Sequence, residues 1–171
     1  MNRKHVASWA VFDLAGSIYS SVVAATVFAV YFGDFIVGNE ANRGDQLWGW
    51  VGSVSVAMVA LSSPLLGAIA DRAGIRKRLM IGYTLVGIAA VCLFTTLDQG
   101  MVVWGFVLAV LANFAFEGSL VFYNAYLPDI APRKHQGRVS GLGFGLGYAG
   151  SAVGLLVAIP LARAERFDLL W

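Results

Sequence analysis

Long runs without a charged residue dominate the pattern of this chain. Five such runs separate the ionisable positions: residues 14–33, 46–70, 79–97, 99–116 and 139–162. A helix needs about 17 to 25 apolar residues to cross about 30 Å of hydrocarbon, and it satisfies its own backbone there. The pattern therefore predicts an all-α polytopic membrane protein. We expect one transmembrane domain over residues 1–171, with five helices at about residues 7–35, 47–70, 79–97, 101–126 and 139–161.

Composition and charge agree with this prediction and add an orientation. The chain is 58% hydrophobic and 13% charged, whereas soluble domains carry about 25% charged residues. The basic cluster at 76–78 would suit nucleic acid in a soluble protein, but beside five spans it is better explained by topology, and no nucleic-acid partner is expected. The positive-inside rule puts the N-terminus in the cytoplasm. Nine basic residues then lie inside, namely Arg3, Lys4, Arg72, Arg76, Lys77, Arg78, Arg133, Lys134 and Arg138.

One carboxylate lies inside a predicted span. Glu117 is about 14 Å along the helix from Tyr126, close to the bilayer midplane, where an ionised acid is costly unless it is paired. Three interpretations stay open: a protonated acid bonded to Asn113, an ion pair with a cation on other helices, or a wet cavity in which the acid binds substrate or carries a proton. Intramembrane acids are functional by default. Asn113 and Asn124 share a polar face with Glu117, which favours the cavity, and Tyr123 lies to one side as a ligand contact.

A second acid, Asp13, shares one face of the first span with Ser17 and Ser20. It lies about 6 Å along the axis from Trp9, an aromatic residue expected at the inner membrane interface. A structural and a functional role are equally favoured at that depth. The candidate substrate or proton pathway therefore consists of Glu117, Asp13, Asn113, Asn124 and Tyr123.

The fifth run is rich in glycine. Four glycines share one helical face, and their spacing permits close contact with a neighbouring helix. We expect this face to serve helix packing. Its residues are Gly143, Gly147, Gly150 and Gly154.

The loop after the second span reads GAIADRAGIRKR from Gly67 to Arg78. Asp71 lies at a helix C-terminus, where the dipole disfavours an acid, so it needs a nearby arginine or another helix N-terminus as partner. The loop resembles the signature loop of the major facilitator superfamily, which braces the two halves of a transporter on the cytoplasmic side. The resemblance implies a cytoplasmic gating loop made of Gly67, Asp71, Arg72, Gly74, Arg76 and Lys77.

Further motifs narrow the resemblance to the vacuole-effluxer-like (autophagy-related amino acid effluxer-like) branch of that superfamily. They are Trp9 with Asp13, Ser63–Gly67, Phe116-Glu117, Phe122–Asp129, Gly137–Gly141 and Gly147-Tyr148. The resemblance implies a secondary active transporter that works by alternating access, with amino acids exported by fungal members. Facilitator halves have six spans, so five spans suggest an incomplete N-terminal half. The short loops suggest a bacterial cytoplasmic (inner) membrane.

Catalysis is not expected. An intramembrane hydrolase needs a buried nucleophile with histidine, paired aspartates or a zinc-binding histidine motif, whereas His5 and His135 lie in cytoplasmic segments. No cofactor or metal is expected. The expected partners are the lipid bilayer, a small solute such as an amino acid together with protons, and the helices of the remaining C-terminal half. The alternative function is a non-transporting membrane scaffold or assembly subunit that binds partner helices through its glycine face.

Overall fold

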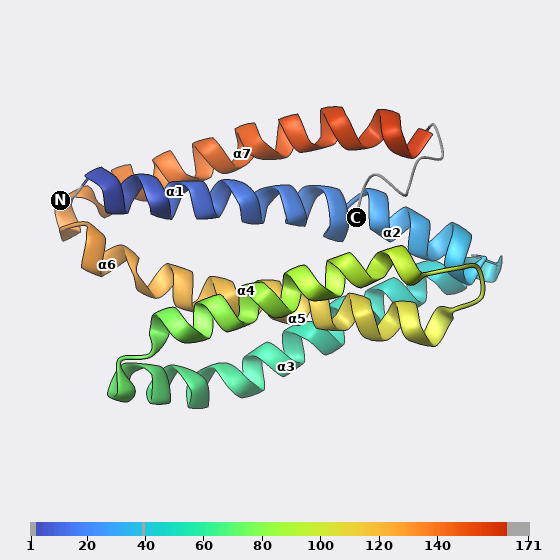
Figure 1. Cartoon of the computed structure of the whole chain (residues 1–171), viewed down its shortest axis with the longest axis horizontal. Coiled ribbons are helices and arrows are strands. Elements are labelled where there is room, and N and C mark those ends of the chain that lie inside the picture. Colours follow the sequence, from blue (N-terminus) through green and yellow to red (C-terminus); the bar gives the residue numbers. More distant parts are fainter. Residues whose placement is uncertain (1–2, 39, 164–171) are drawn as a thin grey trace. The chain divides into compact units, whose positions relative to one another are not determined.

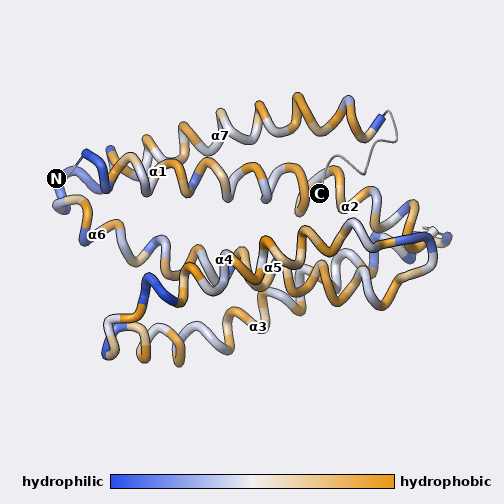
Figure 2. Tube along the Cα trace, viewed as in Figure 1, coloured by the Kyte–Doolittle hydropathy of each residue, from blue (hydrophilic) through white to orange (hydrophobic). Residues whose placement is uncertain are grey.

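The computed structural model describes residues 3–38 and 40–163, and every regular element in those ranges is helical (Figure 1). Five of its helical segments are long and apolar enough to cross a membrane, which confirms the predicted fold class. Figure 2 shows hydrophobic residues along the lengths of these helices and hydrophilic residues gathered near their ends and turns. The five segments are Arg3–Val37, Glu40–Ala73, Arg76–Thr96, Val102–Ile130 and Arg133–Arg163.

The first segment is not one regular helix. α1 (Arg3–Ile18) passes into a widened turn, η1 (Tyr19–Ala24), and the short α2 (Val27–Val30) passes into a second widened turn, η2 (Tyr31–Val37). Such turns leave carbonyl groups without their usual partner, and hydroxyl side chains can satisfy them in a membrane. The Ser21 hydroxyl donates to the Ser17 carbonyl (2.9 Å), and the Thr26 hydroxyl donates to the Ser21 carbonyl. The hydroxyl groups of Ser21 and Thr26 thus satisfy backbone carbonyl groups in the irregular part of the first segment.

The second long segment ends at a residue with left-handed backbone. A short turn, η3 (Glu40–Asn42), leads into α3 (Arg43–Ala73), which ends at Gly74. Gly74 has φ 64° and donates its N–H to the Ala70 carbonyl, as a helix C-cap does. The remaining elements are α4 (Arg76–Cys92), η4 (Leu93–Thr96), α5 (Val102–Ala125), α6 (Leu127–Ile130) and α7 (Arg133–Arg163).

The described chain forms two compact units. The first unit runs to Phe28 and resumes at Tyr123, so it holds α1, η1, α6 and α7 together with the last turn of α5. The second unit, from Ala29 to Phe122, holds η2, α3, α4, η4 and most of α5. The expectation of a single domain over the whole chain stays a prediction.

Polar side chains inside the second unit bond to backbone carbonyls. Ser55 of α3 is buried, and its hydroxyl lies 2.6 Å from the Val51 carbonyl and 3.2 Å from the Val110 carbonyl of α5. The Tyr31 hydroxyl donates to the Leu97 carbonyl (3.2 Å). The hydroxyl groups of Ser55 and Tyr31 therefore have partners, as an apolar interior requires.

Candidate functional site

In the first unit, the glycines of α7 lie against α1. A methyl group on Gly143 would lie 2.6 Å from the Trp9 ring, and one on Gly150 would lie 2.8 Å from the Leu14 side chain. Gly147 and Gly154 meet Ser17 and Ile18 in the same way. The absence of side chains on these glycines lets the two helix backbones approach closely. We call Gly143, Gly147, Gly150 and Gly154 the glycine ridge.

The contacts along the glycine ridge show that α1 and α7 run parallel. Trp9 meets Gly143 and Ile18 meets Gly154, so the contact residues advance in the same direction along both helices. Figure 1 shows α1 and α7 side by side in this arrangement. The Ser151 hydroxyl adds a hydrogen bond to the Ser17 carbonyl (2.9 Å). Both helices therefore begin on the same side of a membrane that they cross.

Asp13 lies on this contact surface. Its Oδ2 atom is 3.4 Å from the position that a Cβ on Gly143 would take and 3.2 Å from that on Gly147. The glycine ridge thus leaves room for the Asp13 carboxylate between α1 and α7. Larger side chains at Gly143 and Gly147 would occupy that space. Asp13 is half-buried. The structure brings together Asp13 and Tyr123 from the predicted pathway, because the Tyr123 phenol also approaches this carboxylate.

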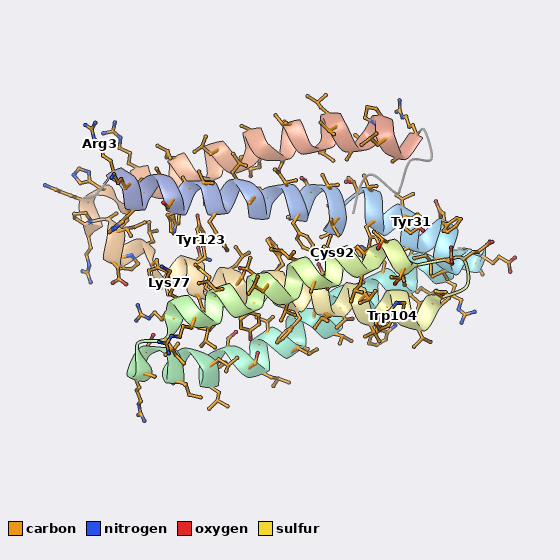
Figure 3. The ribbon with its side chains drawn as sticks, in the orientation of Figure 1. Arg3, Tyr31, Lys77, Cys92, Trp104 and Tyr123 are labelled. Atoms are coloured by element: carbon orange, nitrogen blue, oxygen red, sulfur yellow. The ribbon has the colours of Figure 1, made fainter. Side chains whose placement is uncertain are left out.

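Tyr123 belongs to an aromatic stack around Asp13. Its ring is stacked on Trp9, with centroids 4.4 Å apart and planes at 12°, and on Phe12 at 5.2 Å. The Trp9 Nε1–H donates to the Tyr123 backbone carbonyl (3.2 Å), which lies in the last turn of α5. Figure 3 labels Tyr123 beside α1. Trp9 is buried in this packing, and its expected place at the inner membrane interface stays a prediction.

The Tyr123 hydroxyl has an unusual environment. Only 4% of the residue is exposed, and the hydroxyl approaches Asp13 without reaching the geometry of a hydrogen bond to any group in residues 3–38 and 40–163. Buried polar groups almost always have partners. A carboxylate facing a buried phenol can accept or share a proton. Tyr123 is therefore buried beside Asp13, and its role as a ligand contact stays a prediction.

Glu117 and Asn113 lie on the part of α5 that belongs to the second unit. The span Val102–Ile130 has 29 residues, so Glu117 is one position beyond its midpoint at residue 116. Its side chain is exposed, and in the described residues its carboxylate forms no ion pair or hydrogen bond, the one with Asn113 included. Asn113 is half-buried, and Asn124, in the first unit, is exposed.

Asp71, near the end of α3, forms an ion pair with Arg76, the basic partner that it was expected to need. The Arg76 Nε–H donates to the Asp71 carboxylate at 2.6 Å, and both side chains remain partly exposed. The left-handed Gly74 turns the chain so that α4 begins two residues later. Arg76 therefore faces back toward the end of α3. The structure corrects the extent of the predicted loop, because only Gly74 and Ile75 lie between the two helices. Half-buried Gly67 and exposed Arg72 belong to α3, and exposed Lys77 (labelled in Figure 3) belongs to α4.

Sequence reasoning missed several contacts of these sites. Ser151 gave no signal, because a single serine in an apolar helix has no motif. The place of Phe12 in the aromatic stack could not be read from a pattern either. Tyr83 of α4 lies on Gly118, next to Glu117, and the spacing of Phe114, Gly118 and Phe122 was the available signal.

Comparison with known proteins agrees with this architecture. The family described as "Vacuole effluxer Atg22 like" matches residues 49–166, more than half of the chain. The MFS-type transporter YxiO of Bacillus subtilis is 31% identical over 167 residues, which are 95% of this chain and 39% of that protein. Autophagy-related protein 22 of Chaetomium globosum is 29% identical over 55% of this chain and 14% of its own length. No solved structure matches the chain.

A human protein, monocarboxylate transporter 10, is also similar, with 28% identity over 70% of this chain and 22% of its own length. The chain thus spans well under half the length of each of these relatives. Its five spans and its similarity to MFS-type transporters make it an integral membrane protein. The chain belongs to the Atg22-like vacuole effluxer family of the major facilitator superfamily.

Proposed function

We propose that this chain is part of a secondary active transporter that moves a small solute of the amino-acid class by alternating access, with Glu117 as its proton-carrying acid. The observation that supports this role best is the position of Glu117: an exposed carboxylate one residue from the middle of an apolar span. Such a group is costly in hydrocarbon and is retained where it faces a wet path or takes up a proton.

Asp13 and Tyr123 supply a second acidic group for the same pathway. They lie together in the first unit, with the carboxylate in the space that the glycine ridge leaves. A transported proton needs groups that accept it and give it up along its route. We assign Glu117, Asp13 and Tyr123 to proton transfer and the amides of Asn113 and Asn124 to solute contact.

The parallel packing of α1 and α7 supports a cytoplasmic N-terminus. Both helices begin with exposed basic residues, Arg3 and Lys4 on α1 and Arg133, Lys134 and Arg138 on α7. Basic residues at the starts of two parallel spans mark one side of the membrane, and the positive-inside rule makes that side the cytoplasm. We propose the cytoplasmic membrane of a bacterium as its location. The loop with the Asp71–Arg76 pair then lies on the cytoplasmic side, where it braces the transporter.

A chimaera tests the transport proposal. This chain replaces the matching 167-residue stretch of the Bacillus subtilis relative, and the purified chimaera is placed in proteoliposomes with an inward-acidic or inward-alkaline pH gradient. Uptake of a panel of radiolabelled amino acids is measured with and without the gradient. We expect gradient-dependent uptake of at least one amino acid and a loss of about tenfold or more in Glu117→Gln.

Asp98→Asn is the matched control, because Asp98 is an exposed acid outside the long helices. This variant should transport at the rate of the parent chimaera. Uptake by Glu117→Gln that equals the parent at every pH and still follows the gradient would refute proton transfer by Glu117. A chimaera that moves none of the amino acids would refute the proposed solute class.

A non-transporting scaffold is the other candidate function. It relied on the glycine ridge as the surface that binds partner helices. The structure shows that this ridge lies against α1 of the same chain. The surface on which that function depended is therefore occupied, and transport is the better supported proposal.

A further inference from the structure

Tyr83 of α4 lies in a slot on α5 directly beside Glu117. Three residues of α5 at positions i, i+4 and i+8 form the slot: Phe114, Gly118 and Phe122. The Tyr83 ring meets Phe114 edge-on, with centroids 5.4 Å apart and planes at 61°, and it meets Phe122 at 5.9 Å. Gly118, between the two phenylalanines, is buried.

The fit at the centre of the slot is tight. A methyl group on Gly118 would lie 2.6 Å from Tyr83 Cδ1 and 2.8 Å from Cζ, closer than carbon atoms pack. The ring therefore rests on the helix backbone and fills the space of the absent side chain. A second contact, between Gly87 of α4 and Ala115 of α5, lies one turn along, where a methyl on Gly87 would be 3.4 Å from the Ala115 Cβ. Two contacts one turn apart resist rotation of α5 against α4.

This contact bears on Glu117 because the acid precedes Gly118 by one residue. Successive residues of a helix point about 100° apart, so the slot faces α4 while Glu117 stays exposed. A side chain about 5 to 6 Å from the helix axis moves by about 1 Å for each 10° that the helix turns. Small rotations of α5 would therefore displace the carboxylate by distances that matter for proton transfer.

We propose that Tyr83 is a positioning residue: its ring, seated in the slot formed by Phe114, Gly118 and Phe122, fixes the rotation of α5 and so the direction in which Glu117 is presented. The inference deepens the transport proposal and rests on the role given there to Glu117. It concerns the aromatic ring of Tyr83 rather than its hydroxyl, because the ring makes every contact that defines the slot.

The test measures how readily a reagent in the membrane reaches the Glu117 carboxyl group, and it does not require transport. The full chain is reconstituted in liposomes and treated with a membrane-soluble carbodiimide, which adds to a protonated carboxyl group. Mass spectrometry then gives the fraction of Glu117 modified against time, and Glu117→Gln gives the background. We expect the rate to fall about tenfold in Tyr83→Ala and in Gly118→Ala. Tyr83→Phe, which keeps the ring, should retain the rate of the unmodified chain.

Gly82→Ala is the matched control. Gly82 neighbours Tyr83 on α4, but a methyl group there meets nothing within 4 Å, so labelling should not change. A water-soluble carbodiimide reports exposed Asp98 in the same samples and shows that each variant is folded and accessible. The double variant Tyr83→Ala/Gly118→Ala should label at the rate of Tyr83→Ala alone, because the methyl group no longer meets a ring. Coupling of this kind is the signature of a direct contact.

Labelling of Glu117 at the unmodified rate in both Tyr83→Ala and Gly118→Ala would overturn the proposal. An equal loss in Gly82→Ala, or a loss in Tyr83→Phe as large as in Tyr83→Ala, would overturn it as well. Failure of the transport proposal looks different: Glu117→Gln would leave uptake by the chimaera unchanged, while the labelling pattern of the Tyr83 and Gly118 variants would still hold.

Discussion

Replacing Gly150 by alanine tests the close packing of α1 and α7. The added methyl group would lie 2.8 Å from Leu14 Cγ and 3.1 Å from the Leu14 carbonyl oxygen. The carbonyl belongs to the backbone of α1, so a side-chain rotation cannot relieve both contacts. Overpacking of this kind costs about 1 to 3 kcal/mol. Alanine also favours the helix over glycine by about 1 kcal/mol, so the net loss of stability in this variant is smaller than the clash itself.

Gly145→Ala supplies the comparison that isolates the clash. Gly145 lies on the same helix but is exposed, and a methyl group there meets nothing within 4 Å. Both variants gain the same helix preference, so the difference between them measures packing alone. We expect Gly150→Ala to be less stable than Gly145→Ala by about 1 to 3 kcal/mol.

Unfolding of the two variants in the same detergent micelles, followed by circular dichroism against denaturant, measures this difference. A Gly141→Ala variant, also in open space, should behave like Gly145→Ala. Equal stability of Gly150→Ala and Gly145→Ala would show that the two helices do not approach as described. The reasoning about the glycine ridge would then be refuted, and with it the parallel order of α1 and α7.

Three further variants test local contacts. Trp9→Phe keeps an aromatic ring but removes the hydrogen bond to the Tyr123 carbonyl, so unfolding should show a loss of about 1 kcal/mol; an unchanged stability would contradict that bond. Asp71→Asn breaks an exposed ion pair with Arg76, so it should cost under about 1 kcal/mol, and the effect should shrink further in about 1 M salt. Gly74→Ala forces a side chain onto φ 64° and should cost about 1 to 2 kcal/mol, whereas no loss would argue against the left-handed cap.

Only part of the candidate site could be predicted from the sequence. Glu117 stood out because charge is rare in apolar runs, and Asp13 stood out for the same reason. What surrounds each acid could not be read in this way. Asp13 faces Tyr123, which is more than a hundred residues away in the chain, and no local pattern encodes a contact at that separation. The burial of Trp9 has the same cause, because it depends on Gly143 of α7.

The slot beside Glu117 is a second feature that the sequence alone could not predict. A glycine between two phenylalanines, each one helical turn away, is consistent with plain packing, lipid contact or a notch for a partner. Only the placement of α4 decides that the Tyr83 ring fills it. The sequence indicated which residues could pack closely, but only the structure showed which residue each of them contacts.

Hydropathy by itself determined the class of protein and the five spans, because the cost of leaving backbone groups unsatisfied in hydrocarbon acts residue by residue along the chain. It did not determine the loops, since α3 and α4 extend into the segment predicted as a loop. Local charge likewise identified Asp71 as an acid in need of a partner and Glu117 as an acid out of place. The tertiary structure decided which helices meet, that α1 and α7 run parallel, and that Glu117 stays exposed while Tyr123 is buried. Those outcomes depend on how the surfaces of two helices fit together. A helix in lipid gains little free energy from burying apolar area against another helix. Small residues and single hydrogen bonds therefore decide which helices pack together.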